Sequence, residues 1–247
     1  MSNPATTPAL ELCLLGGVEL KGAADGAADK LLAQSKAVAL LAYLALAPAG
    51  RFQRRDMLVG LLWPDLDQAH ARNDLRKVIH IIRTTLGDEI LSARGDEEIA
   101  INSAVVRCDA STFRSAADNG RLAQALELYH GDLMPGFFLR DCAEFERWLE
   151  GERAELKERD AAASWAMAVA SEGQGNYTLA GRWARRAVQR AWNNERVLRR
   201  ALSMLDRIGD RAGAMRLFDE FSVRLEKDLG VKPSRETVQL VESIRAR

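Results

Sequence analysis

One stretch decides the fold class of this 247-residue chain: LLWPDLDQAHARNDLRKVIHIIRTTLG, residues 61–87. Apolar residues recur through its second half at spacings of three and four, which predicts an amphipathic helix over 66–86. Pro64 disfavours helical backbone at the residue before it, so the short helix predicted over 56–62 has to end near Trp63. The stretch therefore indicates two helices joined by a tight turn.

Both ends of the longer helix carry residues that are typical of helix caps. Asp65 is the predicted N-cap because Gln68 follows it in the arrangement of a capping box, and Gly87 is the predicted stop. Upstream, the apolar pattern over 37–44 predicts one more helix, which ends before Pro48. Three helical segments thus follow one another, with the tight turn before the third.

Short segments with β-strand character flank these helices. Residues 10–20 contain two β-compatible runs around Gly16-Gly17, and 90–101 contain a second hairpin around Arg94-Gly95-Asp96. The small and polar residues of 21–29 predict a loop. A hairpin, three helices and another hairpin, in this order, predict a winged helix-turn-helix.

The second half of the chain contains a repeat. Gly175-Asn176-Tyr177 with Ala180 recurs 34 residues later as Gly209-Asp210-Arg211 with Ala214, and 120–129 hold a partial copy. Glycine permits the turn between two helices, and alanine lets neighbouring helices approach closely. This period is typical of tetratricopeptide repeats, so we expect helical hairpins.

These patterns predict a mainly α protein with two domains. Residues 1–108 are expected to form an α+β winged helix-turn-helix DNA-binding domain, ordered from about residue 9. Residues 109–247 are expected to form an all-α, tetratricopeptide-like domain of helical hairpins. Phe137-Phe138 and Trp148 are expected to lie in the core beneath these hairpins.

Composition and residue spacing exclude several classes of protein. Basic and acidic residues number 35 each, so any attraction to nucleic acid has to come from a local patch of charge. No apolar stretch is long enough to cross a bilayer and the first nine residues lack a signal sequence, so we expect a cytoplasmic protein. No phosphate loop or catalytic motif is present, and we expect no enzyme. We also expect no metal or cofactor, because the cysteines and histidines are isolated: Cys13, Cys108, Cys142, His70, His80 and His130.

The helix over 66–86 divides into an apolar face and a basic face. On a helical wheel its basic and amide side chains fall in one sector: Arg72, Asn73, Arg76, Lys77, His80 and Arg83. Arginine forms paired hydrogen bonds with guanine and asparagine does so with adenine, whereas Lys77, at the margin of the sector, suits a phosphate. The pattern predicts a recognition helix for the major groove; the alternative is a solvated amphipathic face.

Other arginines are candidates for contacts with the DNA backbone or minor groove. Arg54 and Arg55 begin the preceding helix, which lies near the backbone in the usual docking of this fold. Arg94 lies at the tip of the predicted wing, where an arginine can enter the minor groove. Asp96-Glu97-Glu98 follows directly and repels phosphate, which argues against a contact through the wing.

A second basic stripe lies in the helical half of the chain. Arg182, Arg186 and Arg190 fall on one side of a predicted helix, opposite small residues. The stripe suits contact with the DNA backbone or with an acidic surface of a partner such as RNA polymerase. Pairing of these arginines with the acidic helix predicted over 142–160 is the alternative, and the sequence leaves both open.

Motifs spread over residues 10–245 match one family of regulators. In the N-terminal half they are Leu62-Trp63-Pro64-Asp65, Ala71-Arg72-Asn73, Leu75-Arg76, Ile82-Arg83 and Leu86-Gly87. Further along they are Cys108-Asp109, Phe113, Tyr129-His130-Gly131-Asp132-Leu133-Met134-Pro135-Gly136, Trp148, Glu152-Arg153, Leu225-Glu226 and Leu229-Gly230-Val231-Lys232-Pro233-Ser234. Together they resemble the streptomycete antibiotic regulatory protein (SARP) type of activator, with its bacterial transcriptional activator domain.

The resemblance implies an OmpR-type winged helix joined to a tetratricopeptide-like domain. It implies binding to direct repeats in double-stranded promoter DNA and help in recruiting RNA polymerase, with Arg72, Asn73, Arg76 and Lys77 in DNA-facing positions. Two copies bound head to tail are compatible with a homodimer on DNA, and no membrane is implied. The rival class is a tetratricopeptide interaction scaffold without specific DNA binding, and salt-dependent DNA affinity separates the two.

Overall fold

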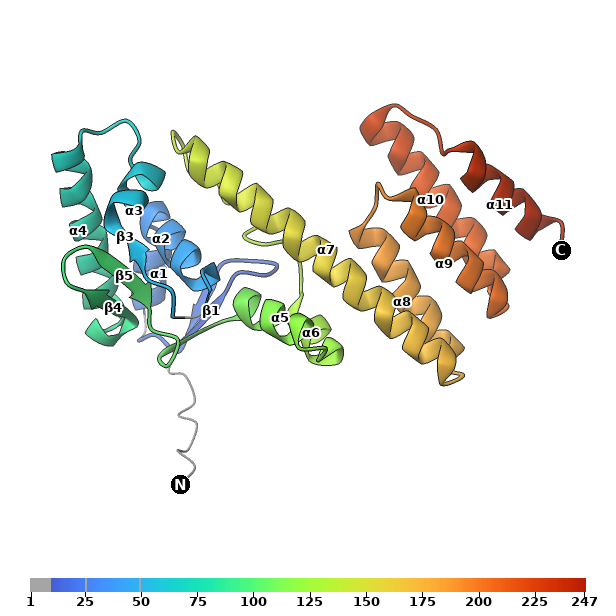
Figure 1. Ribbon diagram of the computed structural model, residues 1–247, viewed down its shortest axis with the longest axis horizontal. Helices are drawn as coiled ribbons and strands as arrows, with labels where there is room; N and C mark the ends of the chain where they lie inside the picture. The colour runs from blue at the N-terminus through green and yellow to red at the C-terminus, as the bar shows by residue number, and fades with distance from the viewer. Residues whose placement is uncertain (1–9, 25, 49) are drawn as a thin grey trace, which may run out of the picture. The chain divides into compact units, whose positions relative to one another are not determined.

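The computed structural model describes residues 10–247 apart from residues 25 and 49 (Figure 1). It divides into two compact units. The N-terminal unit comprises Met1–Ser115 and Leu128–Leu156, and the C-terminal unit comprises Ala116–Glu127 and Lys157–Arg247. Residue 9, near which order is expected to start, lies outside the described residues. So does residue 25, in the loop expected over 21–29.

The N-terminal unit contains the elements of a winged helix-turn-helix. In chain order they are β1 (Leu10–Cys13), β2 (Glu19–Lys21), α1 (Ala27–Leu32), α2 (Ser35–Leu46), β3 (Gln53–Arg54), α3 (Arg55–Leu62), α4 (Gln68–Leu86), the single turn η1 (Asp88–Ile90), β4 (Leu91–Arg94), β5 (Glu98–Ile101) and β6 (Val106–Cys108). Both predicted hairpins are confirmed, because β1 pairs antiparallel with β2 and β4 with β5. The sequence does not predict β3 and β6, which complete sheets of order β3-β5-β4 and β2-β1-β6. Two or three residues are too few to show an alternating pattern.

One helix begins inside the segment expected to be a loop. α1 starts at Ala27, directly after Gly26 with its φ of 71°, so the expectation of a loop is wrong from Ala27 onward. Leu31 gives the physical reason, because its side chain is completely buried. Burial of a leucine stabilises a short helix that would be marginal in isolation.

α4 starts two residues later than its capping residues predict. Asp67, and not Asp65, is the N-cap: its Oδ1 accepts hydrogen bonds from the backbone N–H groups of Ala69 and His70, both at 3.1 Å. The bond from the His70 backbone, with that from the His70 ring, holds the pKa of Asp67 below its ordinary value. Gly87 follows the helix, as predicted.

Residues 128–156 are bound to the winged helix by backbone and side-chain hydrogen bonds. Leu15 forms an antiparallel bridge with Leu133, and Arg153 of α7 (Ala143–Gly173) donates from Nε to the carbonyl of Leu133 at 2.9 Å. Cys142 donates from Sγ to the carbonyl of Leu62, the last residue of α3, at 3.2 Å. The segment is therefore fixed beside the turn that precedes α4.

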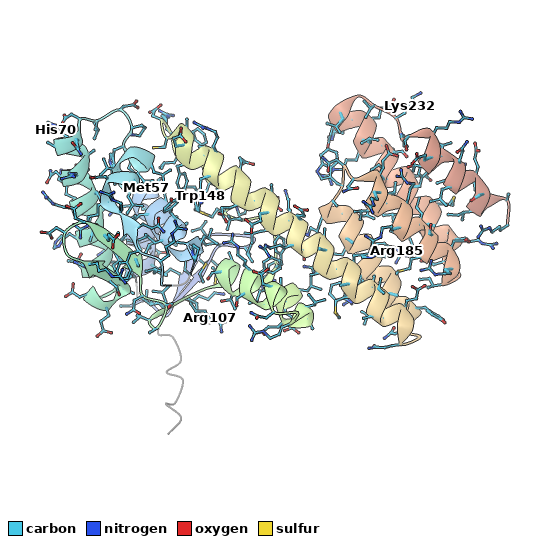
Figure 2. All side chains as sticks on the ribbon, viewed as in Figure 1. Met57, His70, Arg107, Trp148, Arg185 and Lys232 are labelled. Carbon is cyan, nitrogen blue, oxygen red and sulfur yellow. The ribbon has the colours of Figure 1, made fainter. Side chains whose placement is uncertain are left out.

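Two of the three aromatic residues expected in the core pack against other rings, but they do so in the N-terminal unit and not beneath the helical hairpins. Trp148 (Figure 2) lies with its ring centre 4.8 Å from that of Tyr43 and 5.2 Å from that of Phe145. Phe137 meets Phe145 edge-on at 6.1 Å. Phe138 is 66% exposed, so the expectation that it is buried is wrong. Neighbouring side chains in an irregular segment point in different directions, and one surface cannot bury both.

Gly131 packs so closely on Gly16 that no side chain fits between them. A Cβ atom at position 131 would lie 2.7 Å from the Cα atom of Gly16. We expect Gly131→Ala to lower the free energy of unfolding by about 1–3 kcal/mol in urea denaturation, because one backbone has to move.

The control is Gly151→Ala in α7, where a Cβ meets no atom within 4 Å. This change should raise the free energy of unfolding by roughly 0.5–1 kcal/mol, since alanine favours helix over glycine. Equal effects of the two substitutions would contradict the close approach of Gly131 and Gly16.

The C-terminal unit is built from helical hairpins. Its helices are α6 (Leu122–Leu128), the second half of α7, α8 (Tyr177–Arg190), α9 (Glu195–Arg207), α10 (Arg211–Leu229) and α11 (Arg235–Arg245), while α5 (Asp109–Asp118) begins in the N-terminal unit. The predicted repeat is confirmed. Gly175 and Gly209, with φ of 73° and 85°, form the two turns, and Asn176 and Asp210 cap the helices that follow.

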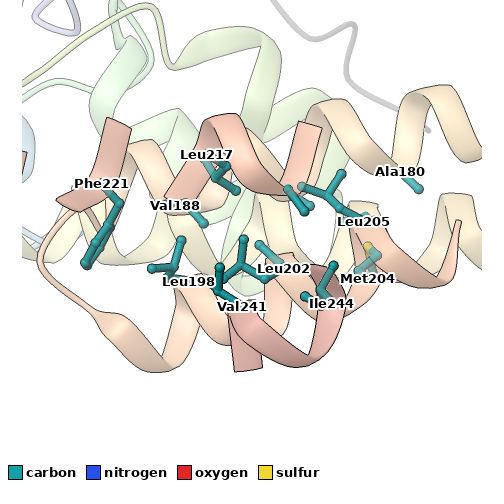
Figure 3. Close-up of a cluster of buried hydrophobic side chains, with 14 of the residues drawn as sticks. Ala180, Val188, Leu198, Leu202, Met204, Leu205, Leu217, Phe221, Val241 and Ile244 are labelled. Carbon is teal, nitrogen blue, oxygen red and sulfur yellow. The ribbon is translucent and has the colours of Figure 1, made fainter. Parts of the chain in front are cut away.

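The core of these hairpins consists of alanine, leucine, valine and isoleucine side chains together with Met204 and Phe221 (Figure 3). Ala180 and Ala214, the alanines of the repeat, are both completely buried in it. They let helices approach closely, as the repeat predicts. Within the described part of the chain, no helix combines the length and the apolar character that crossing a membrane requires.

Glu195 holds the last helix through its carboxylate. It accepts hydrogen bonds from the backbone N–H of Ser234 at 2.9 Å, from the Ser234 hydroxyl at 2.6 Å and from the hydroxyl of Thr237. Burial by itself raises the pKa of the Glu195 carboxyl. The bonds from Ser234 and Thr237, with the charge of Arg199, outweigh burial and leave that pKa below its ordinary value.

We expect the Glu195 carboxylate to make the C-terminal unit sensitive to acid. A lowered pKa in the folded state contributes stability above the unfolded-state pKa of about 4.3, and this contribution is lost as the pH falls through the folded-state pKa. Glu195→Gln should therefore lower the free energy of unfolding by about 2 kcal/mol at neutral pH and by progressively less toward about pH 3. Urea unfolding across this range, with the exposed Glu226→Gln as control, measures the effect; a loss independent of pH would contradict it.

Candidate nucleic-acid interface

α4 has the two faces that its sequence predicts. Its buried face, which packs on α1, α2 and α3, consists of Ala71, Leu75, Val78, Ile79 and Ile82. The opposite side exposes polar and basic side chains: Asn73, Arg76, Lys77 and His80. His70 lies at the beginning of the same helix (Figure 2).

Three of the exposed side chains are unengaged within the described part of the chain. Asn73, Arg76 and His80 form no side-chain hydrogen bond or ion pair with another residue in the described part of the chain. Their amide, guanidinium and imidazole groups are types that hydrogen-bond to base edges and phosphates. The structure therefore brings together the central residues of the predicted recognition face.

Arg72 is engaged with another helix. Its Nε and Nη2 atoms donate to Oδ1 of Asp56 in α3, at 3.0 and 2.7 Å, and the two side chains are 42% and 39% exposed. The guanidinium thus ties α4 to α3, which differs from the free DNA-facing position that the family resemblance implies. No local pattern in the sequence identifies Asp56 as the partner, because it lies 16 residues before Arg72 on a different helix.

Lys77 and Arg83 lie at the margins of the exposed face. Lys77 donates to Asp74 at 2.9 Å in an exposed pair, which water screens and a phosphate can replace. Arg83 is half-buried and donates from Nη2 to the carbonyl of Leu91 at 3.3 Å. Arg83 therefore attaches the end of α4 to the first strand of the wing.

The remaining candidates lie on β3, on the start of α3 and on the wing. Arg54 is exposed, whereas Arg55 is half-buried and donates its backbone N–H to the carbonyl of Glu97 at 2.9 Å. The guanidinium carbon of Arg94 lies 4.0 Å from the ring centre of Phe52, which holds this arginine on the wing. Asp96-Glu97 line a narrow crevice of about 30 Å³ together with residues of α3 and α4, so negative charge lies beside the exposed face.

The basic stripe of α8 is largely neutralised within the C-terminal unit. Arg186 and Arg190 each lie 2.7 Å from a carboxylate oxygen of Asp160, whose side chain is completely buried. For these two arginines the structure has the pairing with the acidic helix over 142–160, which is one of the two alternatives that the sequence leaves open. Arg182 is exposed, with its guanidinium carbon 5.4 Å from the ring centre of Trp183.

A winged helix-turn-helix with a polar exposed helix, in one chain with tetratricopeptide-like hairpins, is the architecture of a transcriptional regulator. Residues 102–245 match the model of the family described as the bacterial transcriptional activator domain, and the chain belongs to this family. The match confirms the resemblance to SARP-type activators. The family is one of transcriptional regulators and not of enzymes.

Among solved structures, the chain is similar to Mycobacterium tuberculosis EmbR in complex with a low affinity phosphopeptide. The two share 20% sequence identity with a TM-score of 0.63, which confirms the fold. The similarity covers 97% of this chain and 66% of that chain, so this chain spans just under two thirds of the EmbR chain. No curated protein matches the sequence.

Proposed function

We propose that the protein is a sequence-specific DNA-binding transcriptional activator, which binds direct repeats in promoter DNA and helps to recruit RNA polymerase. One observation carries the proposal: the face of α4 opposite its buried side presents the unengaged side chains of Asn73, Arg76 and His80. In a winged helix-turn-helix this face enters the major groove. The 1–108 domain binds DNA, and 109–247 act as the activator domain.

The contacts of each residue suggest its role. Arg76 and Asn73 read base edges, because both form bidentate hydrogen bonds there. His80, Lys77, Arg54 and Arg55 contact phosphates, and Arg94 reaches the minor groove only after it leaves Phe52. Arg72 and Arg83 act as positioning residues through Asp56 and Leu91.

The different roles of Arg72 and Arg76 can be measured. We expect Arg72→Ala to weaken binding of a specific site by less than about 1 kcal/mol, because its partly exposed pair with Asp56 contributes little. Asp56→Ala should weaken binding to the same extent, since it removes the same contact. Fluorescence anisotropy with a labelled duplex measures the DNA affinity of both variants. If only Arg72→Ala lowers this affinity, the guanidinium of Arg72 contacts DNA directly.

Salt dependence tests the proposal against an interaction scaffold. If the interface neutralises about four phosphates, the logarithm of the affinity falls against the logarithm of salt concentration with a slope of about −3.6. Anisotropy titrations of the full chain on a duplex, over a fourfold range of salt on the order of 50–200 mM, give this slope. A scaffold without a DNA site would bind duplex weakly, with no preference for sequence.

A further inference from the structure

Phe138 lies on the rim of an open hollow in the N-terminal unit. The hollow has a volume of about 550 Å³ and is lined by Gln34, Ser35, Lys36, Phe138, Leu139 and Arg140. Phe138 is 66% exposed, which is unusual for a ring of this size in a folded protein. Nothing in the winged helix-turn-helix fold or in DNA reading uses this aromatic side chain.

The segment that carries Phe138 is held on both sides. Met134 and Asp141 have positive φ angles of 44° and 60°, a conformation that residues other than glycine keep only when their surroundings fix it. Arg153 donates to the carbonyls of Met134, at 2.6 Å, and of Phe137, at 3.3 Å, while the backbone N–H of Leu139 donates to Glu146 at 2.7 Å. The exposed ring is therefore presented by a fixed backbone.

The hollow carries positive charge. Lys36 and Arg140 are cations, and none of the lining residues is a carboxylate. The Nζ atom of Lys36 lies 4.7 Å from the ring centre of Trp63, which places this charge next to the turn before α4. Arg140 is exposed and its side chain forms no hydrogen bond or ion pair with another described residue.

We propose that this hollow, which we call the Phe138 hollow, binds an acidic segment of another protein, in which a carboxylate lies next to an aromatic or aliphatic side chain. The apolar side chain of the partner packs on Phe138, and the carboxylate pairs with Lys36 and Arg140. An aromatic anchor beside cations on a preformed surface has the composition of an interface hot spot. The inference rests on the proposed function, in which RNA polymerase supplies the segment.

The test measures binding of the full-length protein to purified RNA polymerase holoenzyme without DNA, and binding to promoter DNA in parallel. The variants are Phe138→Ser, which changes an exposed residue, and Lys36→Glu/Arg140→Glu, which reverses the charge of the hollow. Matched controls on α10 are Val223→Ser, at a side chain that is 68% exposed, and Arg216→Glu, at an exposed arginine. Circular dichroism verifies that each variant is folded.

We expect both hollow variants to bind polymerase at least roughly tenfold more weakly than the wild type and the controls. The DNA affinity of Phe138→Ser should stay within about twofold of the wild type, because this substitution changes no charge and lies outside α4. Polymerase binding that is unchanged in Phe138→Ser, or unchanged after charge reversal, overturns the proposal, as does a wild type that does not bind polymerase. A wild type that does not bind promoter DNA would contradict the proposed function. If that wild type still binds polymerase, and the two hollow variants bind it more weakly, the proposal for the Phe138 hollow is supported.

Discussion

The Arg76→Ala variant is expected to bind its best promoter site about 1–3 kcal/mol more weakly than the wild type and to lose preference at one base position. Arg76 is exposed, unengaged and central on the polar face of α4, so its removal deletes a bidentate contact without disturbing the core. Anisotropy titrations on the selected duplex, and on duplexes with each single base changed, measure both effects.

The control for Arg76→Ala is Arg216→Ala, which removes the same charge from an exposed position on α10. It should leave affinity and base preference unchanged. Equal losses for the two variants would show that only net charge matters. Unchanged affinity of the Arg76→Ala variant would contradict the proposal that α4 reads the bases through Arg76.

Asp160→Ala is expected to produce the largest loss of stability in the C-terminal unit. Its carboxylate is completely buried and pairs with both Arg186 and Arg190. Without it, two partly buried guanidinium groups lose the buried carboxylate that neutralises their charge, which lowers the free energy of unfolding by about 3 kcal/mol. Urea unfolding followed by circular dichroism measures this change.

Asp118→Ala is the matched control, because Asp118 pairs with Arg159 on the surface and its side chain is 52% exposed. An exposed pair of this kind contributes at most about 1 kcal/mol. If Asp118→Ala and Asp160→Ala destabilise the protein equally, the Asp160 cluster does not have the structural role assigned to it. In that case Arg186 and Arg190 return as candidates for binding a partner.

Much of the fold follows from local patterns in the sequence. The structure confirms the helix predicted from the apolar spacing along α4, the two flanking hairpins and the helical hairpins of the 34-residue repeat. These features arise from contacts between residues close in the chain, or from a repeated unit. The N-cap of α4 is displaced by two residues, because Asp65 and Asp67 are both suitable caps and the side chain that accepts the N–H groups of the first turn is that of Asp67.

The features that sequence analysis misses depend on contacts between distant residues. Nothing local links Arg72 to Asp56, and for Arg186 the sequence offers pairing with the acidic helix only as one of two alternatives. A basic face on a helical wheel therefore overstates the charge available to a ligand. Phe138 shows the opposite error, since an aromatic residue expected in the core lies on the surface. On α4 the pattern predicts which face is buried and which is exposed, and the structure separates the unengaged side chains of the exposed face from the engaged ones.

Selection of genomic DNA fragments by the purified full-length protein tests the central claim most directly. Fragments bound at about 150 mM salt are sequenced and compared with those bound by Arg76→Ala. We expect enrichment of a repeated motif whose half-sites lie about 10–10.5 base pairs apart, with a base preference that Arg76→Ala relaxes. Enrichment no greater than that of random fragments, for the wild type as for the variant, would contradict the central claim.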